Sequence, residues 1–423
     1  MRIFLGPVDI AGYYTNLAQG FRKIGIEAHC FFLRPHPFQY QGRDSEHFFL
    51  NWIDFLDRSM KSENRLTALF ASFLYVGTQF CLFIYAAIRF DVFIFGFGRG
   101  ILPKSLLQAE LWFLKRLGKK LIFRFHGSDC RPPYINGFRP DNKDRVCIEK
   151  IKRAKQKIKI IERYADFCIT APAQAQFFEK DFIWGGFLGP PQPPRIMDEI
   201  KSPENSTRCV KILHSPSRFE SKGSSLILQM IEKLKDEGFD IDFTLLQGAS
   251  NAEVLKRISE SDLVIDQCYS DTPMAGLAAE AASLGKATLV GGYISSELEK
   301  YFPISHTAPS FFCQPEEMLD KIRAIIRKPA CLKQKGREAQ SFIKDKWSQE
   351  TVAAGFMRLL EKNIPSQWYF SPLEIEYGLG AGIDKIQVKA NVKHLIETHG
   401  LESLQLNDKP RLIQFYQKMI TSG

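Results

Sequence analysis

The sequence predicts an α/β protein with two parallel sheets, each covered by helices. Short apolar runs typical of buried strands alternate with stretches in which apolar residues recur at helical spacing. This alternation favours right-handed βαβ units and therefore parallel sheets. It occurs once before and once after the Pro-rich segment 189–194, and the 423 residues suffice for two or three domains.

The first half of the chain is expected to form a sheet of its own. Apolar runs predict strands at 3–5, 28–32, 92–95, 121–125 and 167–170. Helical spacing of apolar residues predicts helices at about 17–24 and 106–117.

A long uncharged segment, residues 66–88, lies between Arg65 and Arg89. It is long enough to span a bilayer. A strand-like run follows it at once, however, and a span would divide the N-terminal sheet between the two sides of a membrane. We therefore expect a helix that is buried in the protein or lies on a membrane.

The second half repeats the alternation with more regularity. Apolar runs predict strands at 210–214, 243–246, 263–265 and 287–290, with helices at about 226–234, 254–258 and 274–284. Gly285 is expected to end the last of these helices. The predicted organisation is an N-terminal domain 1–190, a linker 191–208, a second domain 209–345, and C-terminal helices with a small helical appendage at 346–423.

Composition limits the possible partners and the compartment. The net charge of +10 and pI near 9.0 favour anionic partners, although a solvated basic surface explains them equally well. The nine cysteines have no regular spacing, which favours free thiols in a reducing, cytoplasmic compartment. The sequence shows no zinc spacing, no dinucleotide or Walker fingerprint and no nucleic-acid-binding module. We expect no metal, no cofactor and no nucleic acid.

Ligands of such sheets bind beyond the carboxyl ends of the strands. The turn after strand 210–214 contains Arg218, Lys222 and Gly223 and opens a helix. A helix N-terminus favours anions, and two added cations would suit a diphosphate. An ordinary basic surface turn is the alternative.

A second turn opens the helix that follows strand 263–265. It contains Met274, Ala275, Gly276 and Leu277, and Glu280 follows one turn into the helix. A carboxylate there could accept hydrogen bonds from sugar hydroxyls. The alternative is a surface Glu that stabilises a helix N-terminus.

Two further strand ends carry candidate residues. His126 and Asp129 follow strand 121–125, where they could reach into a cleft, and we predict them as catalytic residues. The alternative is a turn His that is solvated or bonded locally, with Asp129 as a helix cap. Gly6, Ala11 and Gly12 lie between the first strand and first helix and would let a ligand approach closely.

These motifs resemble those of GT-B glycosyltransferases, especially family 4. The resemblance covers residues 1–362 and is strongest at the Arg218–Gly223 turn, the run 261–266 and the run 280–286. It implies two Rossmann-like domains that face a cleft, with Arg218 and Lys222 on the donor diphosphate. It also implies Glu280 on the ribose, amides of the 274–277 turn on the donor sugar, and His126 in the sugar pocket.

The chain departs from the family pattern at one acid. The family has two Glu separated by seven residues, and Thr272 occupies the earlier position, with Asp271 beside it. Three explanations stay open: Asp271 substitutes after a local shift, the sugar is bound differently, or the protein is a weak or inactive member.

Three functions remain open on the sequence alone. The first is transfer of a sugar from a nucleotide sugar to a glycan or lipid-linked acceptor of a cell-surface polysaccharide, with retention of configuration, at the inner face of the membrane. The second is another GT-B enzyme, such as a nucleotide-sugar epimerase or a phosphorylase. The third is a non-catalytic binding or scaffold protein.

Overall fold

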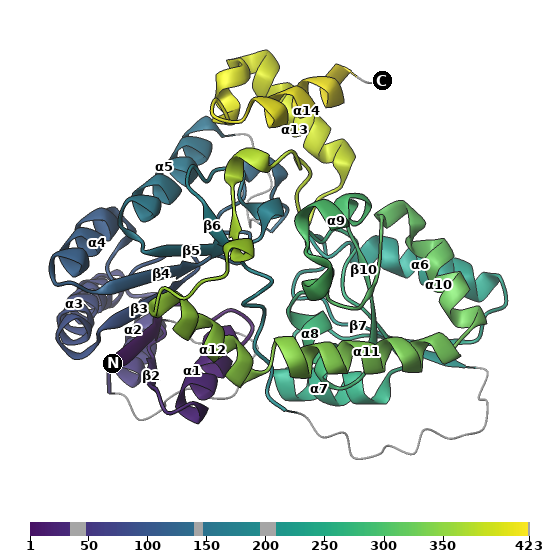
Figure 1. Cartoon of the computed structure of the whole chain (residues 1–423), viewed down its shortest axis with the longest axis horizontal. Coiled ribbons are helices and arrows are strands. Elements are labelled where there is room, and N and C mark those ends of the chain that lie inside the picture. The colour runs from purple at the N-terminus through teal and green to yellow at the C-terminus, as the bar shows by residue number, and fades with distance from the viewer. Residues whose placement is uncertain (34–47, 139–146, 195–208, 422–423) are drawn as a thin grey trace.

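The computed structural model describes residues 1–33, 48–138, 147–194 and 209–421. Two separate sheets lie side by side, and a helical appendage lies above them (Figure 1). The predicted fold class is therefore confirmed. The predicted linker 191–208 lies largely outside the described residues, and the proposed domain boundaries remain predictions.

The first sheet has seven strands in the order β12-β6-β5-β4-β3-β1-β2. All neighbours are parallel except β12 and β6. The predicted strands of the first half are present, and β6 and β12 were not predicted. The strands are β1 (Arg2–Gly6), β2 (Glu27–Cys30), β3 (Val92–Gly96), β4 (Lys120–Arg124), β5 (Phe167–Thr170), β6 (Phe182–Trp184) and β12 (Tyr369–Phe370).

The helices of this half are α1 (Tyr13–Lys23), α2 (Phe48–Ser59), α3 (Arg65–Arg89), α4 (Leu107–Arg116) and α5 (Ile148–Tyr164). Strand order reverses between β1 and β3. In sheets of this kind, ligands usually bind at the carboxyl ends of the two strands where the order reverses.

The second sheet has five parallel strands in the order β11-β10-β9-β7-β8. Its order reverses between β7 and β9. The strands are β7 (Val210–His214), β8 (Ile241–Leu245), β9 (Leu263–Ile265), β10 (Ala287–Gly291) and the unpredicted β11 (Phe311–Cys313). The helices are α6 (Ser224–Asp236), α7 (Asn251–Glu260), α8 (Gly276–Ser283), α9 (Leu298–Tyr301), α10 (Met318–Arg327) and α11 (Ala330–Lys346).

The end of the chain returns to the first sheet. Helix α12 (Gln349–Leu360) packs against α1, and a Cβ at Gly20 would lie only 2.1 Å from the carbonyl oxygen of Gln349. The appendage follows with α13 (Lys385–His399) and α14 (Pro410–Thr421), which pack beside the first half. Since one apolar core includes Leu17 and Phe21 of α1, Phe356 of α12 and Met274 before α8, the two halves share buried surface.

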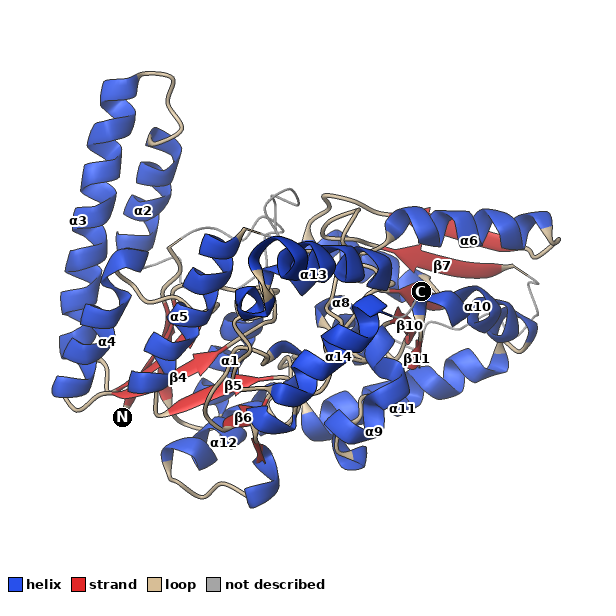
Figure 2. Ribbon diagram, turned by 90° about the horizontal axis from the view of Figure 1, so that it is seen from above, coloured by secondary structure: helices blue, strands red, loops and turns tan. Residues whose placement is uncertain are grey.

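Helix α3 is the long uncharged segment. By length and composition it is the one helix among the described residues that could cross a membrane. Strands β1 and β3, which precede and follow it, pair directly, so it does not divide the sheet. Ala71, Leu82 and Ala86 are buried, and the opposite side of the helix is exposed. The α2–α3 hairpin projects beyond the rest of the protein (Figure 2).

Candidate functional site

The basic turn lies at the carboxyl end of β7, beside the strand-order reversal. Gly223 is the N-cap residue of helix α6 and has a φ of 71°, a left-handed conformation that favours glycine. Lys222 Nζ lies 3.1 Å from Oδ1 of the fully buried Asp266, which follows β9. Arg218 is exposed. The sheet therefore holds Lys222 in place through Asp266 and leaves Arg218 at the surface of the turn.

Phe138, from the first half of the chain, lies over this basic turn. Its carbonyl oxygen accepts a hydrogen bond from Arg218 Nη1, and Lys222 Nζ lies 5.8 Å from the centre of its ring. Phe138 thus contacts both cations from the opposite side of the cleft. A ligand on the cations would have to share this space with Phe138.

The second predicted turn opens α8, which begins at Gly276 rather than Met274. Ala275, Gly276 and Leu277 are partly exposed, and the first backbone amides of a helix have no partner within it. The side chains of Met274 and Leu277 pack into apolar cores. These residues can therefore offer amides, not side chains, to a bound group.

Glu280 lies one turn further into α8 and is buried. Its Oε1 accepts a hydrogen bond of 2.7 Å from Asn251 Nδ2, at the start of α7. Glu280 is therefore not the surface residue of the alternative interpretation. Its carboxylate is oriented by an amide at the carboxyl side of β8, in the same sheet edge as Lys222.

Asp271 does not face an open pocket. Arg131 Nε donates to Asp271 Oδ2 over 2.6 Å, and Gln174 Nε2 donates to Oδ1 over 3.3 Å. Only 4% of each side chain of the Arg131–Asp271 ion pair is exposed. The pair joins the two halves of the chain. Arg131 thereby engages the Asp271 carboxylate, which is the one that could have substituted for the missing Glu.

His126 lies beneath the start of α1. Its Nε2 is 3.0 Å from the hydroxyl oxygen of Tyr14. Burial lowers the pKa of His126 well below its usual value, and the nearby Arg124 charge lowers this pKa further. The imidazole is thus neutral near pH 7 and suited to hydrogen bonding rather than to acid catalysis.

Asp129 helps to shape the loop after β4. Its Oδ1 accepts a hydrogen bond of 2.9 Å from the backbone amide of His126, while Oδ2 is buried without a partner. Gly127, between them, has φ of 103°, and a Cβ there would lie 2.3 Å from Arg131 Nη2. This glycine lets the loop present His126 and Arg131 to the cleft together.

The predicted cleft loop meets the second half directly. Gly12 is the N-cap residue of α1 and has a φ of 72°, and Ala11 has a φ of 51°. A Cβ at Gly276 would lie 3.3 Å from the Cβ of Ala11, so the loop and the start of α8 are in contact. Gly6 is packed differently: a Cβ there would lie 2.1 Å from the carbonyl oxygen of Phe31, within the first half.

A Gly-rich segment of the C-terminal appendage, residues 377–382, also enters the site. Gly382 N donates to the carbonyl oxygen of Tyr269 over 2.8 Å, and Gly137 N donates to that of Ala381 over 2.9 Å. The segment thus connects the two sides of the cleft next to Phe138. Sequence reasoning missed this role, although three closely spaced glycines (378, 380 and 382) were a signal for close backbone approach.

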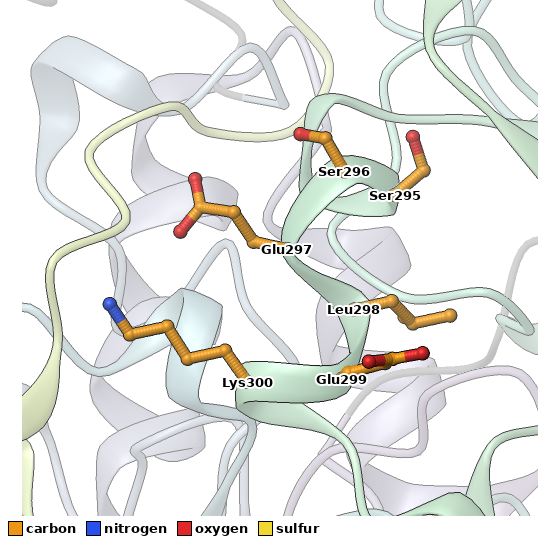
Figure 3. Close-up of a pocket in the computed structure, with 6 residues that line it drawn as sticks. All are labelled: Ser295, Ser296, Glu297, Leu298, Glu299 and Lys300. Carbon is orange, nitrogen blue, oxygen red and sulfur yellow. The ribbon is translucent and has the colours of Figure 1, made fainter.

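A surface hollow lies apart from these residues. It measures about 520 Å³ and is formed by residues 295–300. Glu297 and Lys300 extend toward the appendage, while Leu298 and Glu299 extend the other way (Figure 3). Lys300 pairs with Glu376. None of the predicted site residues lines this hollow, and the residues predicted to face one another across a cleft are in direct contact.

No protein-family model matches the chain, and no curated protein matches it in sequence. Solved structures do match. Sucrose-phosphate synthase from Thermosynechococcus elongatus is 13% identical, with a TM-score of 0.50, and the match covers 86% of this chain and 99% of that one. HepE from Anabaena, solved in complex with UDP-glucose, is 11% identical, with a TM-score of 0.49, and the match covers 85% and 99%.

The likeness to the synthase, together with the two parallel sheets, establishes the GT-B fold. Membership of family 4 stays a resemblance carried by the quoted motifs. The site residues named above likewise remain candidates, since their roles follow from position and chemistry.

Proposed function

We propose that this chain is a glycosyltransferase that uses a nucleotide-diphosphate sugar. The observation that supports this most is the convergence of three groups around the β7–β9 reversal: the Arg218–Gly223 turn, the free amides at the start of α8, and Glu280. Cations and helix N-termini suit a diphosphate, and an oriented buried carboxylate suits the vicinal hydroxyls of a ribose. His126 lies on the facing wall.

In the proposed reaction, the bond between the sugar C1 and the diphosphate oxygen breaks, and a bond forms between C1 and an acceptor hydroxyl oxygen. The acceptor proton leaves with the diphosphate. Lys222 and Arg218 stabilise the charge that develops on the leaving group, so the proposal needs neither a metal nor a cofactor. We further propose retention of configuration, on the resemblance to family 4.

A donor screen tests this proposal. We expect UDP, or another nucleoside diphosphate, to raise the melting temperature by mass action, and the matching nucleotide sugar to release nucleoside diphosphate when an acceptor is present. Interconversion of the nucleotide sugar without an acceptor would indicate an epimerase instead. Binding without any turnover across sugars and acceptors would indicate a non-catalytic protein and would overturn the proposal.

We also propose that the acceptor is a glycan or lipid-linked intermediate of a cell-surface polysaccharide, reached at the cytoplasmic face of a membrane. The exposed side of α3 supports membrane contact, because it is apolar along its length and free of charge between Arg65 and Arg89. Its exposed apolar residues are Leu66, Leu69, Phe70, Phe73, Val76, Phe80, Ile84 and Ile88. Trp112 and Phe113 of the adjacent α4 are exposed beside Arg116, a combination typical of membrane interfaces.

Vesicle flotation tests the membrane contact. Phe70 and Phe73 are 65% and 75% exposed, and their joint replacement by Ser is expected to weaken binding to phosphatidylglycerol vesicles by roughly 100-fold, given about 1.5–3 kcal/mol for each buried Phe. The matched control is Ile304→Ser, an 86% exposed residue of the second half. If the double variant floats with vesicles as wild type does, membrane contact is contradicted. It is also contradicted if wild type is a dimer and the double variant a monomer, because the exposed side of α3 would then contact a second copy of the chain.

A further inference from the structure

Arg124 is a partly buried cation whose guanidinium takes part in no ion pair among the described residues. It is the last residue of β4, at the carboxyl edge that faces the cleft. Its Nε and Nη1 atoms are buried and have no hydrogen-bond partner among the described residues. The guanidinium lies over the ring of Tyr13, whose centre is 5.4 Å from Cζ.

Two acids in the loops after β1 and β4 accept hydrogen bonds from groups other than Arg124. Asp9 accepts hydrogen bonds from the Tyr14 amide and from Thr15 Oγ1. Asp129 accepts from the His126 amide. No described ion pair includes Arg124, although ion pairs engage many other basic side chains of the described chain. Charged hydrogen-bond donors that are removed from water and left without a partner are unfavourable, so a partner from outside the protein is expected.

The surroundings of Arg124 indicate that the expected external partner would bind between the two halves of the chain. A Cβ at Gly185, just after β6, would lie 2.1 Å from Arg124 Nη1, so the glycine makes room for the guanidinium at this sheet edge. Tyr13, over which Arg124 lies, follows directly on the loop that contacts the start of α8. His126, two residues further on, faces the same side. Arg124 therefore belongs to the wall opposite the candidate donor residues.

We propose that Arg124 binds a carboxylate carried by the acceptor or by the transferred sugar. This inference rests on the proposed function. Arginine suits the task because its planar fork donates two parallel hydrogen bonds to such groups. An anionic substrate would offset the free-energy cost of leaving the Arg124 guanidinium without a partner. Arg124 would therefore favour anionic over neutral substrates.

Competition with small glycosides tests the proposal. Methyl β-D-glucuronide is expected to bind wild type more tightly than methyl β-D-glucoside, and Arg124→Gln is expected to remove this preference with a loss of about 10-fold or more in affinity for the glucuronide. Arg124→Lys should retain part of it. Arg116→Gln, an exposed charge change on α4, is the matched control and should keep the preference.

The two sources of the anion are separated by the donor series. If the transferred sugar carries the anionic group, UDP-glucuronate should bind wild type more tightly than UDP-glucose does, and Arg124→Gln should remove this difference. If the acceptor carries the anionic group, only the methyl glycosides should show a preference for the acidic sugar. UDP itself should bind wild type and all variants with equal affinity. If UDP does not bind even to wild type, the proposed donor site is wrong, and this outcome is distinct from a failure of the Arg124 proposal. Absence of any acidic preference in wild type, or its persistence in Arg124→Gln, would overturn the proposal.

A stability measurement excludes a purely structural role. If Arg124 awaits a ligand, the ligand-free Arg124→Gln protein should melt at the same temperature as wild type or higher. A lower melting temperature together with an unchanged acidic preference would show that Arg124 only supports the fold.

Discussion

Replacing Arg218 and Lys222 together by alanine is expected to weaken UDP binding by roughly 100-fold or more. Hydrogen bonds to charged groups contribute about 1.5–3 kcal/mol each, and about 1.4 kcal/mol corresponds to a factor of ten in affinity. The measurement is calorimetric titration of UDP into wild type and variant. Equal affinity would mean that the diphosphate binds elsewhere.

The structure refines this experiment, because Lys222 also neutralises the buried Asp266. Its loss can destabilise the fold as well as the site, so Arg218→Ala alone is the cleaner first variant. Lys233→Ala with Lys235→Ala, two exposed residues near the end of α6, removes the same charge at a distance from the turn. We expect this control to bind UDP as wild type does.

The local sequence pattern was sufficient to predict the central strands but not the short strands toward the edges of the sheets. Strands such as 92–96 and 287–291 are buried on both faces and appear as continuous apolar runs. Strands β6, β11 and β12 have only two or three residues and exist because a neighbour offers them a pairing edge. Such pairing depends on tertiary contacts, and strands this short show no hydrophobic periodicity in the sequence.

The same distinction applies to the candidate site. The basic turn and the start of α8 were predictable, because position after a strand and residue type are local properties. The partners that orient them were not: Asp266 holds Lys222, Asn251 holds Glu280, and Phe138 covers the turn from the other half. Each pairing joins residues far apart in the chain, and a single sequence carries no record of it.

The largest stability effect is expected at the Arg131–Asp271 ion pair. Arg131→Met would leave the Asp271 carboxylate buried and unpaired at the junction of the two halves, which typically costs about 3–5 kcal/mol. Arg131→Met combined with Asp271→Asn should recover most of that loss, because no charge is then stranded and Gln174 can still donate to the Asn oxygen. The free energy of unfolding of wild type, both single variants and the double variant measures the coupling.

The same variants test how the cleft opens. Since the pair joins the two halves, Arg131→Met should also increase the radius of gyration in solution scattering, because hydration of the stranded carboxylate favours separation of the two halves. If the donor sugar binds at Asp271 as the resemblance implies, Arg131 must first leave this carboxylate. If Arg131→Met and the double variant proved equally stable and equally compact, the ion pair would not hold the halves together, and the closed cleft would depend on the Ala11–Gly276 and Gly382–Tyr269 contacts instead.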